Sequence, residues 1–176
     1  ERLQACRQAL AELERSADLA ALEATESAAK ARFRAEAERL SALRLEAGGR
    51  LGQAITQAMQ GLGMAGGRFE VRLQALPEPQ AHGLDQVEFL VAAHPGSTPR
   101  PVGKVASGGE LSRIALAISV CTSEVGSAPT LIFDEVDSGI GGAVAHTVGQ
   151  LMRRLGHDRQ VLAVTHLPQV AACAHQ

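Results

Sequence analysis

The sequence contains no tryptophan and no tyrosine, and it has only four phenylalanines. RNA-recognition and OB-type domains stack bases on aromatic side chains, so this composition argues against a base-stacking nucleic-acid module. An excess of positive charge is also missing, because the formal net charge is −2. Any contact with a nucleic acid would therefore depend on a local basic patch or on another part of a larger assembly.

Cysteine pairs with metal-ligand spacing are absent. Cys6, Cys121 and Cys173 are far apart and odd in number, which indicates neither a disulfide framework nor a zinc ribbon. Free thiols in a cytosolic protein are the simplest interpretation. The sequence also has no run of about 18 apolar residues, and its first residues are polar and unlike a signal peptide. We therefore expect a soluble cytoplasmic protein without a membrane partner.

Glycine and proline are missing from residues 1–47, which are rich in alanine, leucine, glutamate and arginine. Apolar residues recur there at alternating steps of three and four from Leu3 to Ala20, the a/d pattern of a coiled coil. The register then loosens and resumes at Phe33, as at a stutter. The pattern predicts a coiled-coil arm over residues 1–47 that begins upstream of Glu1, and a solvent-bridging helix of a bundle is the alternative. Its mixed charges are typical of a solvated face rather than of a DNA track.

A change of pattern follows at Gly48 and Gly49, which we expect to end the arm before a short helix over residues 50–63. Alternating apolar and polar residues over 68–76 and an apolar segment over 86–93 predict two strands. These strands pair most simply as an antiparallel hairpin with a long, proline-containing loop. A second domain over residues 48–176 is therefore predicted to begin at Gly48.

Helices and strands alternate in the rest of the sequence. A helix is predicted over residues 109–125, followed by a strand over 130–135, a helix over 142–155 and a strand over 159–166. The unbroken apolar runs of the two strands are typical of a parallel sheet buried on both faces. The expected fold class is therefore α/β, a mainly parallel sheet with flanking helices and an antiparallel hairpin, joined to an N-terminal coiled-coil helix.

Polar residues with catalytic potential follow both of these strands. Asp134 and Glu135 end the first strand and His166 ends the second, so all three are expected at one edge of the sheet, where open α/β sheets bind ligands. One carboxylate can hold Mg²⁺ through water, and the other can orient or deprotonate a water molecule. A solvated acidic turn and a histidine satisfied at a sheet edge are the alternatives for these residues taken singly.

A small-residue segment, Ser107-Gly108-Gly109-Glu110, precedes the helix over 109–125. Ser107 is a candidate N-cap, and the glycines let an anion approach the free N–H groups of the helix start, which predicts a phosphate-binding terminus. An ordinary serine-capped helix is the alternative. Neither "GLGMAG" at 61–66 nor Gly103-Lys104 has the context of a phosphate loop, and the 176 residues contain no Walker A sequence.

Three blocks, "SGGELSR", "LIFDEVDSGIGG" and "VTHLPQVA", occur in this order after the arm. Together they resemble the ABC-type ATPase heads of the SMC superfamily, and among them those of bacterial DNA double-strand break repair proteins. The specific part of the resemblance covers residues 105–172. It implies that residues 48–176 are the C-terminal lobe of a head whose Walker A loop lies in an N-terminal half outside this sequence.

The resemblance also implies a role for each site residue. Asp134 looks like the Walker B ligand of Mg²⁺, Glu135 like the catalytic base and His166 like the switch histidine. Asp137 falls in a D-loop that crosses the interface between two heads. The ABC signature, which meets the γ-phosphate of ATP held by a second head, is formed by Ser107, Gly108, Gly109 and Glu110.

The expected cofactors are thus ATP and Mg²⁺. The expected partners are the N-terminal half of the same head, a second head in an ATP-dependent homodimer, and DNA through the complete protein. Hydrolysis would act in DNA repair and recombination close to the nucleoid, and the 176-residue chain alone is expected to be inactive.

Three other functions are compatible with parts of the sequence. A non-hydrolysing structural tethering module is disfavoured by the intact Asp134, Glu135 and His166. The nucleotide-binding domain of an ABC transporter is disfavoured by the glycine-free arm, because a compact helical subdomain precedes the signature in that family. Another SMC-like repair ATPase is disfavoured by the exact residues of "ELSR" and "THLPQVA".

Overall fold

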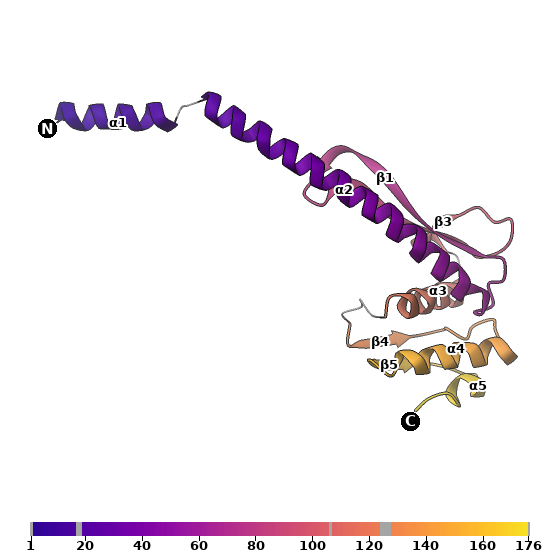
Figure 1. Cartoon of the computed structure of the whole chain (residues 1–176). Helices are drawn as coiled ribbons and strands as arrows, with labels where there is room; N and C mark the ends of the chain where they lie inside the picture. The colour runs from indigo at the N-terminus through magenta and orange to yellow at the C-terminus, as the bar shows by residue number, and fades with distance from the viewer. Residues whose placement is uncertain (1, 17–18, 106, 124–127, 176) are drawn as a thin grey trace.

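The computed structural model describes residues 2–16, 19–105, 107–123 and 128–175, and Figure 1 shows their arrangement. The helices are α1 (Arg2–Ser16), α2 (Leu19–Gln60), α3 (Gly108–Cys121), α4 (Gly142–Leu155) and α5 (Pro168–Ala171), with a 3₁₀ turn at Val102–Lys104. The strands are β1 (Arg68–Gln80), β2 (Gly83–Ala92), β3 (Arg100–Pro101), β4 (Thr130–Phe133) and β5 (Gln160–Ala163). The mixture of long N-terminal helix, hairpin and parallel strands agrees with the predicted fold class.

Helix α2 runs without a break for 42 residues, so the predicted end of the arm at Gly48 and Gly49 is wrong. The glycines are used for close packing against β1 instead. A Cβ atom on Gly48 would lie 3.1 Å from Val71 Cγ1, and one on Gly52 would lie 3.3 Å from the Phe69 carbonyl oxygen. Because tertiary packing on one face stabilises the helix, it tolerates residues of low helix propensity. The predicted arm and the predicted short helix are one element.

The first part of this helix, together with α1, extends away from the rest of the chain (Figure 1). Leucines of α1 remain exposed, with Leu3 at 69%, Leu10 at 61% and Leu13 at 65%. Apolar side chains repeated along a projecting helix are typical of a coiled-coil arm, which keeps that prediction open. Among the described residues, no helix is long and apolar enough to span a bilayer.

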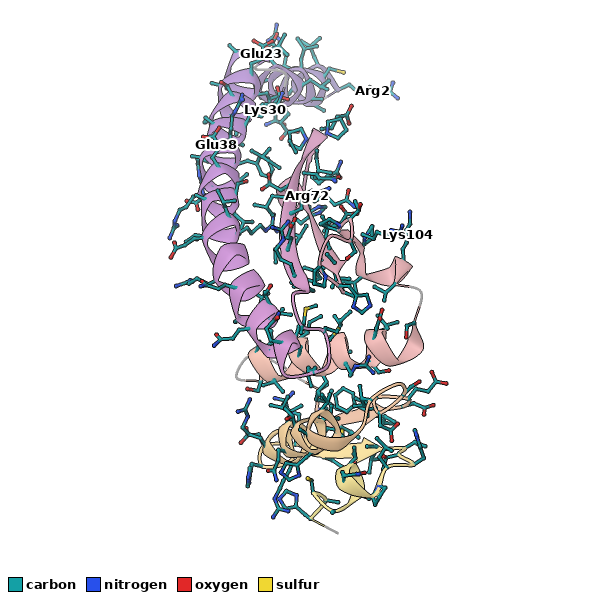
Figure 2. The ribbon with its side chains drawn as sticks, turned by 90° about the vertical axis from the view of Figure 1, so that its right-hand side faces the viewer. Arg2, Glu23, Lys30, Glu38, Arg72 and Lys104 are labelled. Atoms are coloured by element: carbon teal, nitrogen blue, oxygen red, sulfur yellow. The ribbon has the colours of Figure 1, made fainter. Side chains whose placement is uncertain are left out.

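The hairpin is antiparallel as predicted, with Phe69 opposite Val91 and Leu73 opposite Val87. The predicted long loop is wrong, because β1 continues through Pro77 and Pro79 and only residues 81–82 lie between the strands. Since β1 is the edge strand of the order β1-β2-β3, prolines cost it no partner on its outer side. The hairpin lies beside α2 (Figure 2).

Strands β4 and β5 are parallel neighbours, with Phe133 opposite Ala163, and α4 forms the crossover between them. The expected burial of both faces is not observed within the described residues. Phe133 is buried, whereas Ile132 is 71% exposed, Leu162 47% and Val164 64%. The described helices therefore cover one face of this small sheet and leave an apolar opposite face.

The core lies where the C-terminal end of α2, α3 and the β4–α4 unit meet. Its fully buried members come from these segments and from the turn after α2: Ile55, Met59, Leu62, Met64, Ile114, Leu116, Val136 and Val148. Val136 belongs to the turn after β4 and directly follows Asp134 and Glu135. Its burial therefore fixes the segment that carries these acidic residues to the core.

Candidate functional site

The first component of the candidate site is the N-terminus of α3. Ser107 is the N-cap, as predicted, and its Oγ accepts a hydrogen bond from the Glu110 amide at 3.4 Å. Glu110 itself is held by a residue that the sequence analysis missed, because its Oε1 lies 3.0 Å from Nε2 of His94. That contact joins the start of α3 to the loop after β2 and draws the Glu110 carboxylate towards His94.

The start of α3 is packed directly on the turn that follows β4. A Cβ atom on Gly109 would lie 2.9 Å from both Cβ and the carbonyl oxygen of Ser138. Arg113, one turn further along α3, is 5% exposed and donates from Nη1 to the carbonyl oxygens of Ser138 at 2.7 Å and Val136 at 3.5 Å. Burial lowers the pKa of Arg113, and the nearby Glu110 charge counteracts this effect.

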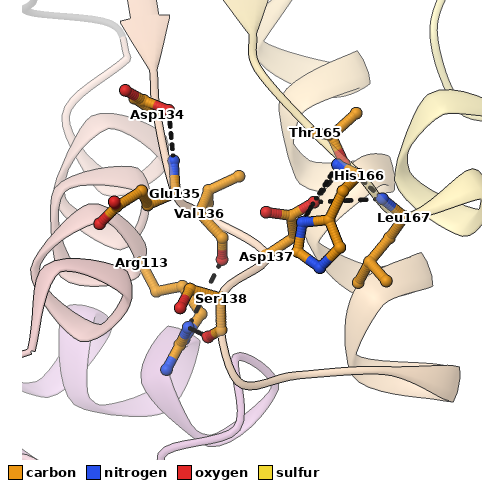
Figure 3. A network of polar contacts seen from close by, with 9 residues as sticks. All are labelled: Arg113, Asp134, Glu135, Val136, Asp137, Ser138, Thr165, His166 and Leu167. Carbon is orange, nitrogen blue, oxygen red and sulfur yellow. Dashed lines mark hydrogen bonds and ion pairs between the residues drawn. The ribbon is translucent and has the colours of Figure 1, made fainter.

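Arg113 thus fixes the geometry between two predicted motifs (Figure 3). Although it lies inside the motif "SGGELSR", the sequence analysis gave it no role of its own. The available signal was a single cation in the apolar stretch from Leu111 to Val120, where a charged side chain is buried only if it finds partners.

The second component is the pair of carboxylates after β4. Asp134 and Glu135 are both exposed. The Glu135 amide donates to Asp134 Oδ1 at 2.9 Å, and Ser112 Oγ of α3 donates to the Asp134 carbonyl oxygen at 2.7 Å. Glu135 has a φ of 55°, and among the described residues it is the only one other than glycine with a positive φ. Such backbone strain is common at functional sites, where the surroundings hold an unfavourable conformation in place.

This backbone conformation directs the Glu135 side chain to the start of α3. Its Oε2 occupies the space beside Gly108, where an added Cβ atom would collide with it. The predicted signature and the predicted catalytic base of the same chain are therefore neighbours. A carboxylate at this position interacts favourably with the positive end of the α3 dipole.

The third component links this turn to β5 and the residues after it. The Asp137 carboxylate is 2% exposed, and its Oδ2 accepts hydrogen bonds from Thr165 Oγ1, from the His166 amide at 2.9 Å and from the Leu167 amide at 3.3 Å. Burial alone would raise the pKa of Asp137, but these hydrogen bonds and the His166 ring lower it below its ordinary value. Asp137 therefore organises the turn that carries His166.

His166 lies on the outer side of this turn. Its side chain is 71% exposed and its Nδ1 lies 3.3 Å from Asp137 Oδ2. The sequence predicts His166 at one sheet edge together with Asp134 and Glu135. In the structure all three residues follow the carboxyl ends of β4 and β5. Asp134 and Glu135 lie nearer to α3, whereas His166 pairs with Asp137 (Figure 3).

The arrangement fits part of a nucleotide–magnesium site. No cluster of three or more histidine, cysteine, aspartate or glutamate residues with metal-binding geometry occurs in the described part of the chain. Two adjacent exposed carboxylates nevertheless suit Mg²⁺, which keeps several water ligands and takes others from phosphates. The capped terminus of α3 suits a phosphate group. The chain thus supplies carboxylates and a helix terminus, but its sequence has no loop to cradle a triphosphate.

Comparison with known proteins identifies relatives over most of the chain. The DNA repair protein RecN of Xylella fastidiosa is 49% identical over 151 residues, which are 85% of this chain and 27% of that protein. RecN of Vibrio cholerae is 48% identical over 147 residues, 81% of this chain and 26% of that protein. The chain thus spans about a quarter of the length of the curated relatives it matches. No family model matches the sequence.

Solved structures with the same fold are SMC head domains. The Smc head domain with an extended coiled coil from Pyrococcus furiosus, bound to the C-terminal domain of ScpA, superposes with a TM-score of 0.61 at 20% identity. The match covers 92% of this chain and 39% of that one. The Smc head domain with a coiled coil and joint from Pyrococcus yayanosii gives 0.62 at 20% identity, covering 93% and 30%. The predicted fold class, a partial ABC-type head of mixed helices and strands with a long N-terminal helix, is confirmed by these matches.

Proposed function

The chain belongs to the RecN family, and from this premise we propose that it is the C-terminal lobe of an ATPase head with its coiled-coil arm, acting in DNA repair and recombination in the cytoplasm. The observation that carries the proposal is the contact between the capped start of α3 and the carboxylate turn after β4, held by Arg113. That contact packs two motifs with separate proposed roles against each other.

In this proposal residues 48–176 form half of a head, and an N-terminal half of the same protein supplies the Walker A loop. The apolar face of the β4–β5 sheet supports such a partner. Ile132 and Leu162 are exposed there, as is Val164 directly after β5, although the composition of the two strands is typical of a sheet covered on both sides. Covering them with the other half would remove this apolar surface from water. The chain alone would therefore bind ATP weakly and would not hydrolyse it.

The proposed roles of the site residues follow from their positions. Asp134 holds Mg²⁺ through water, and Glu135 accepts a proton from the attacking water at its carboxylate. His166, exposed at the end of the Asp137-bonded turn, contacts the nucleotide of its own head. Bound ATP with Mg²⁺ supplies the phosphoanhydride bond that is hydrolysed.

The signature residues act on the opposite nucleotide in a dimer of two heads. Ser107, Gly108 and Gly109 present the free N–H groups of α3 to the phosphate of ATP held by the second head. Such fixed dipoles stabilise developing negative charge without reorganising during the reaction. The Asp137 carboxylate faces its own chain, so we assign the exposed backbone of the turn after it, around Gly139, to the head–head interface. Hydrolysis would open the dimer and thereby release DNA.

Glu135→Gln in the full-length protein tests this proposal. Removing the proton acceptor while keeping the side-chain shape should abolish ATP turnover and leave nucleotide-bound dimers intact. Size-exclusion chromatography with light scattering, with and without ATP, should show a dimer fraction that increases only with ATP. Glu46→Gln, on the exposed side of α2, is the matched control and should behave as the wild type. Turnover at the wild-type rate in Glu135→Gln, without a gain in dimer, would contradict the role proposed for Glu135. Absence of ATP turnover in the wild-type full-length protein would favour a tethering module that does not hydrolyse ATP.

A further inference from the structure

The charge of the chain is distributed unevenly. Although the net charge is −2, residues 142–176 contain three arginines, four of the six histidines and one acidic residue, Asp158. These basic residues are concentrated at the C-terminal end of α4, whose last turn carries Arg153 and Arg154. This end of the helix is the one further from the carboxylate turn, because α4 begins directly after that turn.

A depression of about 390 Å³ lies along this part of α4, and no carboxylate lines it. Its walls are formed by His146, Thr147, Gln150, Leu151, Arg153, Arg154 and His157. Steps of three and four residues place these side chains on one face of α4 and of the turn that follows Leu155. At the rise of an α-helix, the eleven residue steps from His146 to His157 span about 16 Å. We call this surface the α4 basic face.

The basic residues of this face differ in how they are used. Arg153 is committed to its own chain, because Nη1 donates to the carbonyl oxygens of Cys173 at 3.1 Å and Ala174 at 3.3 Å. Arg154 and His157 are exposed, and no ion pair joins either of them to a carboxylate of the described residues.

Arginines of α2 show a contrasting pattern. Arg34 pairs with Glu38 at 3.3 Å, and Arg50 pairs with Glu46 at 3.5 Å. The positive charges of Arg34 and Arg50 are thus balanced locally, whereas that of Arg154 on the α4 basic face is available to an outside anion.

We propose that the α4 basic face binds the phosphate backbone of duplex DNA without reading its sequence. The proposal rests on the proposed function of the complete protein in DNA repair. A row of donors about 16 Å long matches the spacing of several phosphates along one strand. An acidic protein segment fits less well, since protein interfaces centre on apolar or aromatic residues and Leu151 is the one apolar side chain lining this depression.

The double variant Arg154→Gln, His157→Gln in the full-length protein tests the proposal. Both residues are exposed and glutamine is a good helix former, so the fold should be retained. Binding of a fluorescently labelled 30-base-pair duplex is followed by anisotropy between 50 and 200 mM salt. We expect the affinity at the lowest salt to fall about five- to tenfold, and the slope of log K against log salt to decrease by about 1.

Two further variants sharpen the experiment. Gln150→Arg adds a cation to the same face and should strengthen DNA binding. Arg34→Gln, which removes a cation already paired on α2, should leave binding unchanged. ATP turnover should stay at the wild-type rate in all of them, because the α4 basic face lies apart from the carboxylate turn. A failure of this inference is therefore distinguishable from a failure of the proposed ATPase function.

Unchanged affinity and an unchanged salt slope in the double variant would overturn the proposal. It would also be overturned if the double variant lost binding to polyglutamate while its binding to the duplex stayed intact, because the face would then be a site for an acidic protein segment.

Discussion

At the scale of single residues, Gly109 is packed against atoms of the candidate site that cannot move aside. Its position against Ser138 and the Arg113 guanidinium leaves no room for a side chain, and the atoms it would meet include a backbone oxygen that cannot move aside. Gly108, the residue before it, faces only the end of the flexible Glu135 side chain. The two adjacent glycines therefore differ in how much space surrounds them, and alanine substitutions at each position should differ in their effect on stability.

Gly109→Ala is expected to destabilise the protein by about 1–3 kcal/mol, because the added methyl group forces α3 away from the carboxylate turn. Gly108→Ala is the matched control and should change the free energy of unfolding by less than about 0.5 kcal/mol, since Glu135 can rotate away. Urea denaturation of both variants provides the measurement. Equal effects of the two substitutions would contradict the packing described for Gly109.

Asp137 provides a second residue-scale prediction, which depends on pH. Its pKa is lowered in the folded state, so the ionised carboxylate stabilises the fold above the ordinary aspartate pKa of about 3.9. This contribution is lost as the pH falls through the lowered folded-state pKa. Asp137→Asn should therefore cost about 2 kcal/mol at pH 7, and the difference from the wild type should shrink below about pH 4.

Urea titrations at pH 7 and at several values below pH 4 measure this difference. A difference that stays constant over the whole range would show that the Asp137 charge does not stabilise the turn that carries His166. Asp158→Asn, at an exposed aspartate close to the end of α4, serves as the control for a general effect of removing a carboxylate.

At the scale of elements, α2 shows how a helix continues through glycines when its neighbour requires small residues. Gly48 and Gly52 face β1, but an added Cβ atom on Gly49 would meet nothing within 4 Å. Gly49→Ala should therefore stabilise the protein by about 0.5–1 kcal/mol, because alanine has the higher helix propensity. Gly52→Leu should destabilise it by collision with the Phe69 carbonyl oxygen. Thermal unfolding of the two variants is the test, and a lower melting temperature for Gly49→Ala would contradict this account.

The same elements show what the sequence can predict. The alternation of 68–76 and the apolar runs at β4 and β5 specify strands through local periodicity. These strands and the parallel pairing of β4 with β5 are confirmed. The break at Gly48 was predicted from propensity alone, and packing against Val71 overrides it. Likewise, the apolar runs of β4 and β5 predict burial of both sheet faces. They do not reveal that the described residues cover only one of these faces.

For the candidate site, the sequence predicted the local geometry at the start of α3 but not the contacts that connect the parts of the site. Ser107 as N-cap follows from local capping chemistry. The contacts of Arg113 with Ser138 and of His94 with Glu110 join residues 25 and 16 positions apart, and no local rule relates such residues. The inward direction of the Asp137 carboxylate also depends on the turn after β5, which is remote in sequence.

At the scale of the whole molecule, the central claim is that each nucleotide is shared by two heads. Ser107→Arg places a bulky cation at the exposed start of α3, where it should block contact with the opposing nucleotide. Glu135→Gln removes the carboxylate that we propose accepts a proton at the head's own nucleotide. Each full-length variant should be inactive alone, because every site in its homodimer carries the defect.

Mixing these two inactive variants and measuring ATP turnover tests the claim most directly. A mixed dimer combines Glu135 of the first variant with Ser107 of the second at one of its two sites, so the account predicts that the mixture regains a substantial part of the wild-type turnover. Turnover that remains at the level of the separate variants, under conditions where mixed dimers are detected, would contradict it, because Ser107 and Glu135 would then act on the same nucleotide within one chain.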